Sequence, residues 1–392
     1  MLRRHSTNRP DVDTPIIVAG GGVAALEAVL ALRAMTGRDL PITMICPEPR
    51  FVYRPLSVLE GFGATAPAAL HLAGFAEEQG VGLVRARLAG VDAARRCART
   101  DGGQELRYRA LMLAIGGEPR EGLPGARMFS GPADVPVLDG MIDHLEFGQS
   151  DSIAFVNPRA ENWCLPLYEL ALLTRHRLRE RGLARVGVSI VTAEDLPLIS
   201  LGLDAADTAQ MLLRKSGVRL HCNVAALEVR GREIVVADGE PIPADHVVTM
   251  PRVIVADLDG VPQGADGMVE IDDHAAVRGL RDVYAAGDMT AGFPNQGGVA
   301  ARQAAAAARA ILADLGLIEA APPFDVKLRG VMLTPAVLER AASGERWNPP
   351  TKIAAPHLAR YLGTRDPDSE HPEDWPMVGS SPFATEIALG SG

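Results

Sequence analysis

A glycine turn near the start of the chain carries residues suited to holding a phosphorylated ligand. Gly20, Gly22 and Ala25 fit the pattern G-x-G-x-x-G/A and directly follow an apolar run at 16–19. Glycine lets the backbone approach a pyrophosphate, and the helix that the turn opens directs its N–H groups at the negative charge. The pattern predicts a dinucleotide site, the alternative being a structural tight turn. Glu48, after the next expected strand, is the candidate acceptor for ribose hydroxyls, the alternative being an ordinary loop glutamate.

A cysteine stands where a second helix is expected to begin. Apolar periodicity predicts a helix from about 166 to 181, and Cys164 lies just before it. The positive end of a helix dipole lowers a thiol pKa and favours the reactive thiolate. The alternative is a small buried residue packed beside Trp163. Because the four cysteines lie far apart and form no C-x-x-C pair, we expect no metal site and no local redox disulfide.

Alternating strands and helices must position these residues. The run from 14 to 48 reads strand, glycine turn, helix and strand, and the run from 152 to 195 repeats this βαβ order. Short strands joined by glycine turns follow each unit. An alanine-rich helix is expected at 300–315, ended by Gly316. We therefore predict an α/β protein with two Rossmann-like, three-layer nucleotide-binding domains and a C-terminal segment.

Composition and charge exclude other classes. The chain has 392 residues, 47% of them hydrophobic, which is enough for two or three buried cores and excludes disorder for the bulk. A net charge of −10 disfavours nucleic-acid binding, because phosphates require an excess of Lys and Arg. The polar first 15 residues lack the apolar core of a secretory signal, and we see no apolar run of a length that crosses a bilayer. We expect a cytoplasmic protein, with peripheral membrane contact disfavoured by an acidic tail.

Three motifs together resemble those of a known family. They are the turn at 20–25, the strand end LAIGG at 113–117 and the segment VYAAGD at 283–288. In this order and at these separations they resemble the FAD-dependent pyridine nucleotide–disulfide oxidoreductase superfamily, over about residues 15–315. The segments most similar to its branch of sulfide:quinone oxidoreductases and type II NADH dehydrogenases are PEPRFVYRPLSV, NWCLPLYELALLTRHRLRERG, TAEDLPLISLG and NQGGVAARQAAAAA.

The resemblance implies an FAD site and its residues. It places Gly20, Gly22 and Ala25 under the pyrophosphate, Glu48 near the adenosine ribose, Ala114 and Gly116 beside the cofactor, Arg54 near the ring, Gly287 and Asp288 at the ribityl chain or adjacent phosphate, and Gln296, Gly297 and Gly298 at the isoalloxazine edge. The following helix N-terminus can stabilise negative charge on the reduced flavin. The alternatives are a helix N-cap for Asp288 and a solvated loop arginine for Arg54.

The second unit departs from the family pattern at its first turn. Residues 157–166 contain no glycine, and Glu161 would repel phosphates, so tight NAD(P)H binding in the usual pose is not expected. Cys164 matches a cysteine of sulfide:quinone oxidoreductases. However, no cysteine follows Cys222, so the C-terminal redox partner that sulfide oxidation uses in that family is missing.

The resemblance also implies a proton-relay glutamate and a quinone site. Glu169 matches the family's glutamate on the same helix, where it could reach the flavin and relay protons if burial raised its pKa; the alternative is an exposed helix-face glutamate. Related enzymes admit quinone under the C-terminal section, although an apolar stripe there is more often core. The residues interspersed in that stripe are Trp347, Pro349, Pro350, Lys352 and Tyr361.

The predicted organisation is discontinuous, because Asp288 has to return to the first domain. We expect an FAD-binding domain at 1–149 and 250–317, an inserted NAD(P)-type domain with a degenerate loop at 150–249, and a segment at 318–392 that caps the flavin and ends in an acidic tail.

The predicted function is an FAD-dependent oxidoreductase passing two electrons from NAD(P)H, rather than sulfide, to a quinone or other small acceptor. The alternatives are a sulfide:quinone-type enzyme using Cys164 and an FAD-binding scaffold or regulatory protein without turnover. A homodimer is a candidate assembly.

Overall fold

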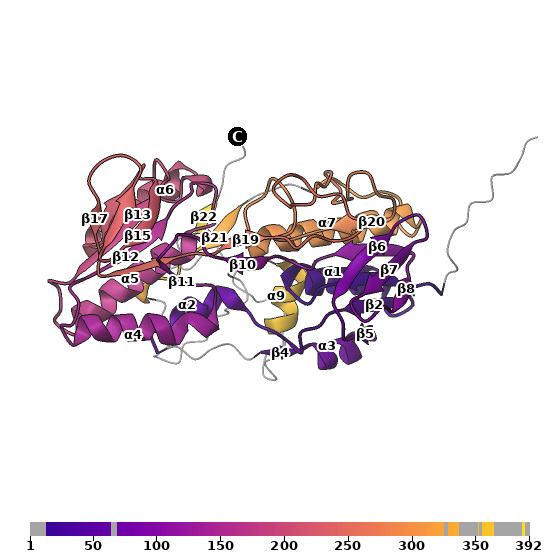
Figure 1. Ribbon diagram of the computed structural model, residues 1–392. Coiled ribbons are helices and arrows are strands. Elements are labelled where there is room, and N and C mark those ends of the chain that lie inside the picture. Colours follow the sequence, from indigo (N-terminus) through magenta and orange to yellow (C-terminus); the bar gives the residue numbers. More distant parts are fainter. Residues whose placement is uncertain are drawn as a thin grey trace, which may run out of the picture.

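Two five-stranded sheets, parallel throughout, form the centres of two units (Figure 1). The computed structural model describes residues 13–63, 69–324, 328–336, 352, 355–363 and 386–388. The first sheet has the order β20 (Val283–Ala285), β9 (Ala110–Leu113), β1 (Ile16–Ala19), β2 (Ile42–Ile45) and β5 (Gly82–Val84). The second has the order β11 (Arg127–Met128), β18 (His246–Thr249), β12 (Ser152–Asn157), β13 (Gly187–Thr192) and β14 (Arg219–His221).

The first sheet is covered on both faces, which explains why β1 is apolar at every position. Helices α1 (Val23–Thr36) and α7 (Gly297–Asp314) pack against each other and share one core with Ile16 and Val18. On the other face Ile17 and Ala19 pack toward a small antiparallel sheet. Its strands are β6 (Leu88–Asp92), β7 (Cys97–Thr100) and β8 (Glu105–Arg107).

The second unit repeats this three-layer plan. Helix α5 (Leu165–Glu180) packs on β12 and β13 and contacts α6 (Leu203–Ser216). Ala154, Val156 and Val191 belong to a separate core on the opposite face. The antiparallel strands that contribute to that core are β15 (Ala226–Arg230), β16 (Glu233–Val236) and β17 (Ile242–Pro243).

An antiparallel pair of strands connects the two units. β10 (Glu118–Arg120) leads out of the first unit and pairs with β19 (Arg252–Ile254), which leads back. β20 then joins the first sheet beside β9, so the predicted insertion of one unit into the other is confirmed. β11 belongs to the second sheet although it precedes residue 150. We therefore propose that the inserted unit spans about residues 121–251, limits that follow from β10 and β19.

Shorter elements complete the described structure. They are β3 (Arg50–Phe51), η1 (Arg54–Leu56), α2 (Ser57–Glu60), β4 (Leu70–His71), α3 (Leu72–Gln79), η2 (Pro132–Asp134), α4 (Val135–Glu146), η3 (Ile199–Leu201), β21 (Arg329–Val331), α9 (Pro356–Gly363) and β22 (Glu386–Ala388). In the C-terminal segment β21 pairs with β22, and α9 packs on α1. Within the described ranges no helix has both the length and the apolar character that a bilayer crossing needs. Trp347, Pro349, Pro350 and the acidic stretch 364–376 lie outside these ranges.

Candidate functional site

The glycine turn connects β1 to α1 and leaves space for a ligand. Gly20 has φ +135°, and a Cβ there would lie 2.0 Å from the carbonyl oxygen of Ala114. Gly22, the N-cap of α1, has no atom within 4 Å of its Cβ position. No side chain caps α1, and its first turn carries no acidic residue. The N–H of Gly20 donates to the carbonyl oxygen of Ile45, so the N–H groups that can face a pyrophosphate are those at the start of α1. This fits the FAD assignment, in which Gly20 and Gly22 permit close approach and Ala25 lies in the first turn of the helix.

The other glycines assigned to the cofactor lie at the same edge of the first sheet. The N–H of Ala114 bonds to Ala19, and the N–H of Ala286 bonds to Leu113, so the ends of β1, β9 and β20 lie side by side. Gly116 has φ +69° with open space at its Cβ position, and Gly287 has φ +86°. This edge is where open α/β sheets bind their ligands.

Glu48 follows β2 by three residues and is exposed. Its Oε2 accepts a hydrogen bond from the Cys46 thiol at 3.2 Å. Burial and this bond to Glu48 raise the pKa of Cys46 to about 12, so the thiol stays protonated. An exposed carboxylate held at the end of the second strand fits the ribose position assigned to it.

Gly287, the residue before Asp288, lies beside the first turn of α7, because a Cβ on Gly287 would come within 3.6 Å of the side chain of Ala300. Burial raises the pKa of Asp288, and the positive charge of Arg54 opposes that rise. The N-cap of α7 is Gln296, whose side chain accepts from the N–H of Val299 at 2.9 Å. The alternative of Asp288 as the N-cap of this helix is therefore wrong. α7 also begins at Gly297, three residues before the predicted start.

Gln303 is a site residue that the sequence motifs did not reveal. It is fully buried on α7, and its Oε1 accepts from the N–H of Gly287 at 2.8 Å. Its Nε2 donates to Thr290 Oγ1 at 2.9 Å. Gln303 thus fixes the turn that carries Asp288. A single amide among eight alanines at 300–310 was the available signal, because a polar side chain on a buried helix face needs a partner.

A buried ion pair joins α5 to the C-terminal segment. Glu169 on α5 is fully buried, and its Oε2 lies 2.7 Å from Lys352 Nζ. Its Oε1 accepts from the N–H of Leu333 at 2.8 Å. Lys352 Nζ also donates to the carbonyl oxygen of Pro55 at 2.8 Å. Glu169 therefore contacts residues from two described C-terminal stretches, and the alternative of an exposed helix-face glutamate is wrong.

The same contacts set the protonation of the pair and place it beside Arg54. Burial raises the pKa of Glu169 despite the opposing effect of Lys352, and burial lowers the pKa of Lys352. Pro55 is the direct neighbour of Arg54, which is close enough to influence the pKa of Asp288. The structure thus brings Glu169 and Lys352 to the segment that carries Arg54, whose positive charge acts on the pKa of Asp288.

Cys164 lies at the N-cap of α5 but does not favour a thiolate. It is only 2% exposed, and its Sγ donates to Glu194 Oε2 at 3.3 Å. Burial first, and then the negative charge of Glu194, raise the pKa of the thiol well above its usual range. The prediction of a lowered pKa was therefore wrong, because desolvation and a buried carboxylate outweigh the helix dipole. The burial expected under the alternative interpretation is observed.

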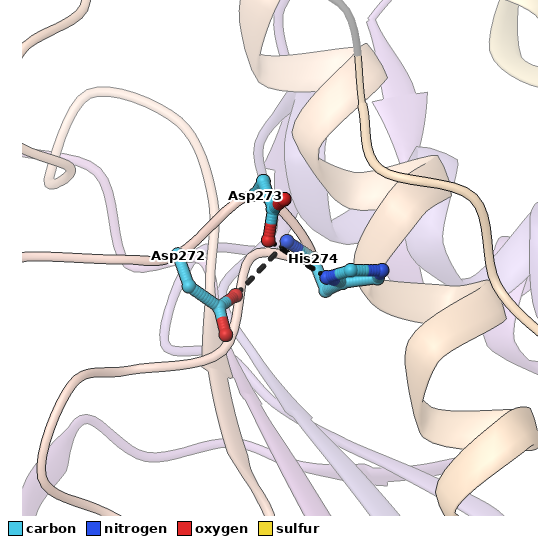
Figure 2. A group of neighbouring side chains, drawn as sticks. All are labelled: Asp272, Asp273 and His274. Carbon is cyan, nitrogen blue, oxygen red and sulfur yellow. Dashed lines mark hydrogen bonds and ion pairs between the residues drawn. The ribbon is translucent and has the colours of Figure 1, made fainter.

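A cluster of Asp272, Asp273 and His274 connects the first unit to the chain after α7 (Figure 2). Asp272 Oδ1 accepts from the N–H groups of His274 and Ala276. His274 Nδ1 lies 2.8 Å from Asp273 Oδ1, and Nε2 lies 3.0 Å from the carbonyl oxygen of Ala321. Two acceptors at the two ring nitrogens favour the imidazolium form. We assign these residues a tethering role.

His274 gives the tether a pH dependence. Its hydrogen bonds to Asp273 and Ala321 raise the pKa of the ring above 6.5. The stabilisation is therefore fully present below about pH 6 and is lost as pH rises through the folded-state pKa. We expect His274→Gln to lower Tm slightly at acidic pH and not at alkaline pH in thermal melts. The exposed His71 provides the control His71→Gln, and an equal Tm loss at both pH values would contradict this assignment.

Comparisons with known proteins agree with this architecture. Residues 172–310 match the family model described as pyridine nucleotide-disulphide oxidoreductase. Mitochondrial sulfide:quinone oxidoreductase of Mus musculus is 28% identical over 102 residues, which are 26% of this chain and only 22% of that protein.

Two solved structures show the same fold. Sulfide:quinone oxidoreductase of Aquifex aeolicus matches with a TM-score of 0.74 and 19% identity over 81% of both chains. A ferredoxin reductase of Rhodopseudomonas palustris matches with a TM-score of 0.62 and 18% identity over 81% of this chain and 80% of its own. The predicted two-unit α/β fold is confirmed. The match to the family model over residues 172–310 and this shared fold agree with the resemblance of the sequence motifs to the pyridine nucleotide-disulphide oxidoreductase superfamily.

Proposed function

We propose that the protein is an FAD-dependent oxidoreductase that passes two electrons from NAD(P)H to a quinone or another small acceptor. The observation that most supports this proposal is the buried ion pair of Glu169 and Lys352, whose Oε2 and Nζ atoms lie 2.7 Å apart. Lys352 Nζ also donates to the carbonyl oxygen of Pro55, beside Arg54. Bound FAD supplies the two-electron chemistry. The residues that would hold it are those of the glycine turn, Glu48, Gly287 and Asp288, with the N-terminus of α7 at the ring.

The Glu169–Lys352 pair suits proton delivery to a reduced acceptor. A quinone that takes two electrons also needs two protons. Burial shifts the pKa of each partner toward its neutral form, which narrows the free-energy gap between the charged pair and one in which the proton has moved from Nζ to Oε2. We propose that Lys352 Nζ presents the proton and that Glu169 positions this amine. Breaking the pair and measuring acceptor reduction tests this role.

The thiol of Cys164 argues against sulfide as the donor. Sulfur chemistry needs an accessible thiolate, whereas this thiol is buried and kept protonated by its surroundings. We expect Cys164→Ser to leave flavin reduction by NAD(P)H within about twofold of wild type, because hydride transfer needs no thiolate. Single-turnover mixing under anaerobic conditions measures this rate.

Native-state labelling with a maleimide provides an independent check on the thiol. Cys222 is half-buried while Cys164 is buried, so Cys222 should react first and Cys164 only on unfolding. Rapid labelling of Cys164 in the folded protein, or loss of sulfide-driven flavin reduction in Cys164→Ser, would support the sulfide route instead. All four cysteines are free thiols, and on this ground we propose a reducing, cytoplasmic location.

A further inference from the structure

The second unit carries a strand-end glutamate whose surroundings differ from those of Glu48. Glu194 follows β13 by two residues and is 1% exposed. In Rossmann units an acidic residue at the end of the second strand accepts the ribose hydroxyls of a dinucleotide. Glu48 holds this place in the first unit and is exposed. The same strand-end position is therefore exposed in the first unit, at Glu48, and buried in the second unit, at Glu194.

Three donors from the protein converge on one oxygen of the Glu194 carboxylate. Oε2 accepts from Tyr168 Oη at 2.9 Å, from Thr192 Oγ1 at 3.0 Å and from Cys164 Sγ at 3.3 Å. The backbone is fixed as well, because the carbonyl oxygen of Glu194 accepts from the N–H of Asn223 at 2.8 Å. A ribose hydroxyl bonded to Oε2 would have to displace these bonds, and the side chain of Glu194 is almost wholly buried. Displacement leaves buried donors unpaired, which is unfavourable.

Two of these donors come from the region where a second pyrophosphate would bind. Cys164 is the N-cap of α5, and Tyr168 is in its first turn. The preceding turn has no glycine to permit close approach of phosphates. Asn157, at the end of β12, donates from Nδ2 to Thr192 Oγ1 at 3.3 Å, which adds the first strand to the same network. The strand ends and the helix start are thus tied to each other.

We propose that the second unit does not recognise a dinucleotide ribose, because Glu194 fastens the start of α5 to β13. That NAD(P)H reduces the flavin rests on the proposed function. In that reaction the protein would hold the nucleotide without recognising its ribose. NADH and NADPH should then be equivalent donors. Glu194 is a positioning residue of the fold in this account.

ADP-ribose separates this inference from the proposed function, because it carries the ribose and pyrophosphate but no hydride. Isothermal titration of the FAD-loaded protein with ADP-ribose should show no saturable binding at ligand concentrations up to about 1 mM. Contacts without ribose recognition are expected to give a Kd weaker than this. Saturable binding with a Kd below about 100 µM that is lost in Glu194→Gln and kept in Glu233→Gln would overturn the inference. Glu233 is an exposed glutamate of the same unit. If Glu194→Gln does not fold, the wild-type protein is sufficient for the test. Saturable binding of ADP-ribose to wild type, tighter than that of 2′-phospho-ADP-ribose, would then overturn the inference.

Flavin reduction by NADH and NADPH gives the second arm. Equal apparent affinities, within about threefold, are expected, and a tenfold or larger preference for NADH would contradict the inference. Failure of both nucleotides to reduce the flavin would instead remove the proposed donor, while the absence of ADP-ribose binding would still support the closed second unit. Glu194→Gln should lower Tm without changing the ratio of the two reduction rates.

Discussion

We expect Gly20→Ala to give a protein that neither folds stably nor retains FAD. The new Cβ would lie 2.0 Å from the carbonyl oxygen of Ala114, at a φ of +135° that side chains rarely adopt. Backbone strain and overpacking together should cost roughly 3–5 kcal/mol. Urea unfolding and the flavin content of the purified protein measure the two effects.

Gly22→Ala is the matched control for this change. Its Cβ would meet no atom within 4 Å, so the free energy of unfolding of the flavin-free protein should change by less than about 1 kcal/mol. The added methyl group would still lie where a pyrophosphate approaches α1, and FAD affinity should fall. A Gly22→Ala protein with wild-type FAD affinity, or a fully stable Gly20→Ala protein, would show that the turn does not work as described.

Breaking the Glu169–Lys352 pair should have the second large effect. Lys352→Met leaves Glu169 buried without its cation, and Glu169→Gln leaves Lys352 without its carboxylate. Removing one partner of a buried pair costs about 3–5 kcal/mol. Removing a positioned proton donor should also slow acceptor reduction by roughly 10²-fold or more and flatten its pH profile. Urea unfolding and steady-state rates across pH measure these changes.

The double variant Glu169→Gln/Lys352→Met separates stability from catalysis. The introduced amide oxygen would still accept from the N–H of Leu333, as Glu169 Oε1 does, and neither buried charge would remain. The double variant should therefore be more stable than either single variant while remaining slow. Glu180→Gln, on the exposed end of the same helix, should change the unfolding free energy by less than about 0.5 kcal/mol. A double variant with wild-type turnover would exclude a proton role for this pair.

Local patterns were sufficient to predict the strand–turn–helix–strand run of each unit and the alanine-rich helix α7, but not α4 (Val135–Glu146) or α6 (Leu203–Ser216). The apolar run 16–19, the glycines after it and the return at 283–288 are each encoded in a few consecutive residues, so the insertion of one unit into the other followed from the sequence. The start of the inserted unit did not. β11 has only two residues, Arg127 and Met128, and so short a strand has no detectable periodicity.

The contacts that define the site are long-range and therefore had no sequence signal. Glu169 and Lys352 are 183 residues apart, and only the fold brings Lys352 to α5. Cys164 illustrates the same limit, because its position before a helix indicated a lowered pKa. The buried carboxylate that reverses this direction comes from Glu194, 30 residues later. The burial of Glu194 became evident only from the packed second unit.

Anaerobic rapid mixing of the FAD-loaded protein with NADH, NADPH and sulfide in parallel tests the central claim most directly. We predict that the flavin absorbance is bleached by both nucleotides, at rates that Cys164→Ser leaves unchanged, and restored by a quinone at a rate that Lys352→Met lowers. Bleaching by sulfide that disappears in Cys164→Ser would contradict the donor assignment. A flavin that responds to dithionite alone would contradict turnover altogether and identify an FAD-binding scaffold.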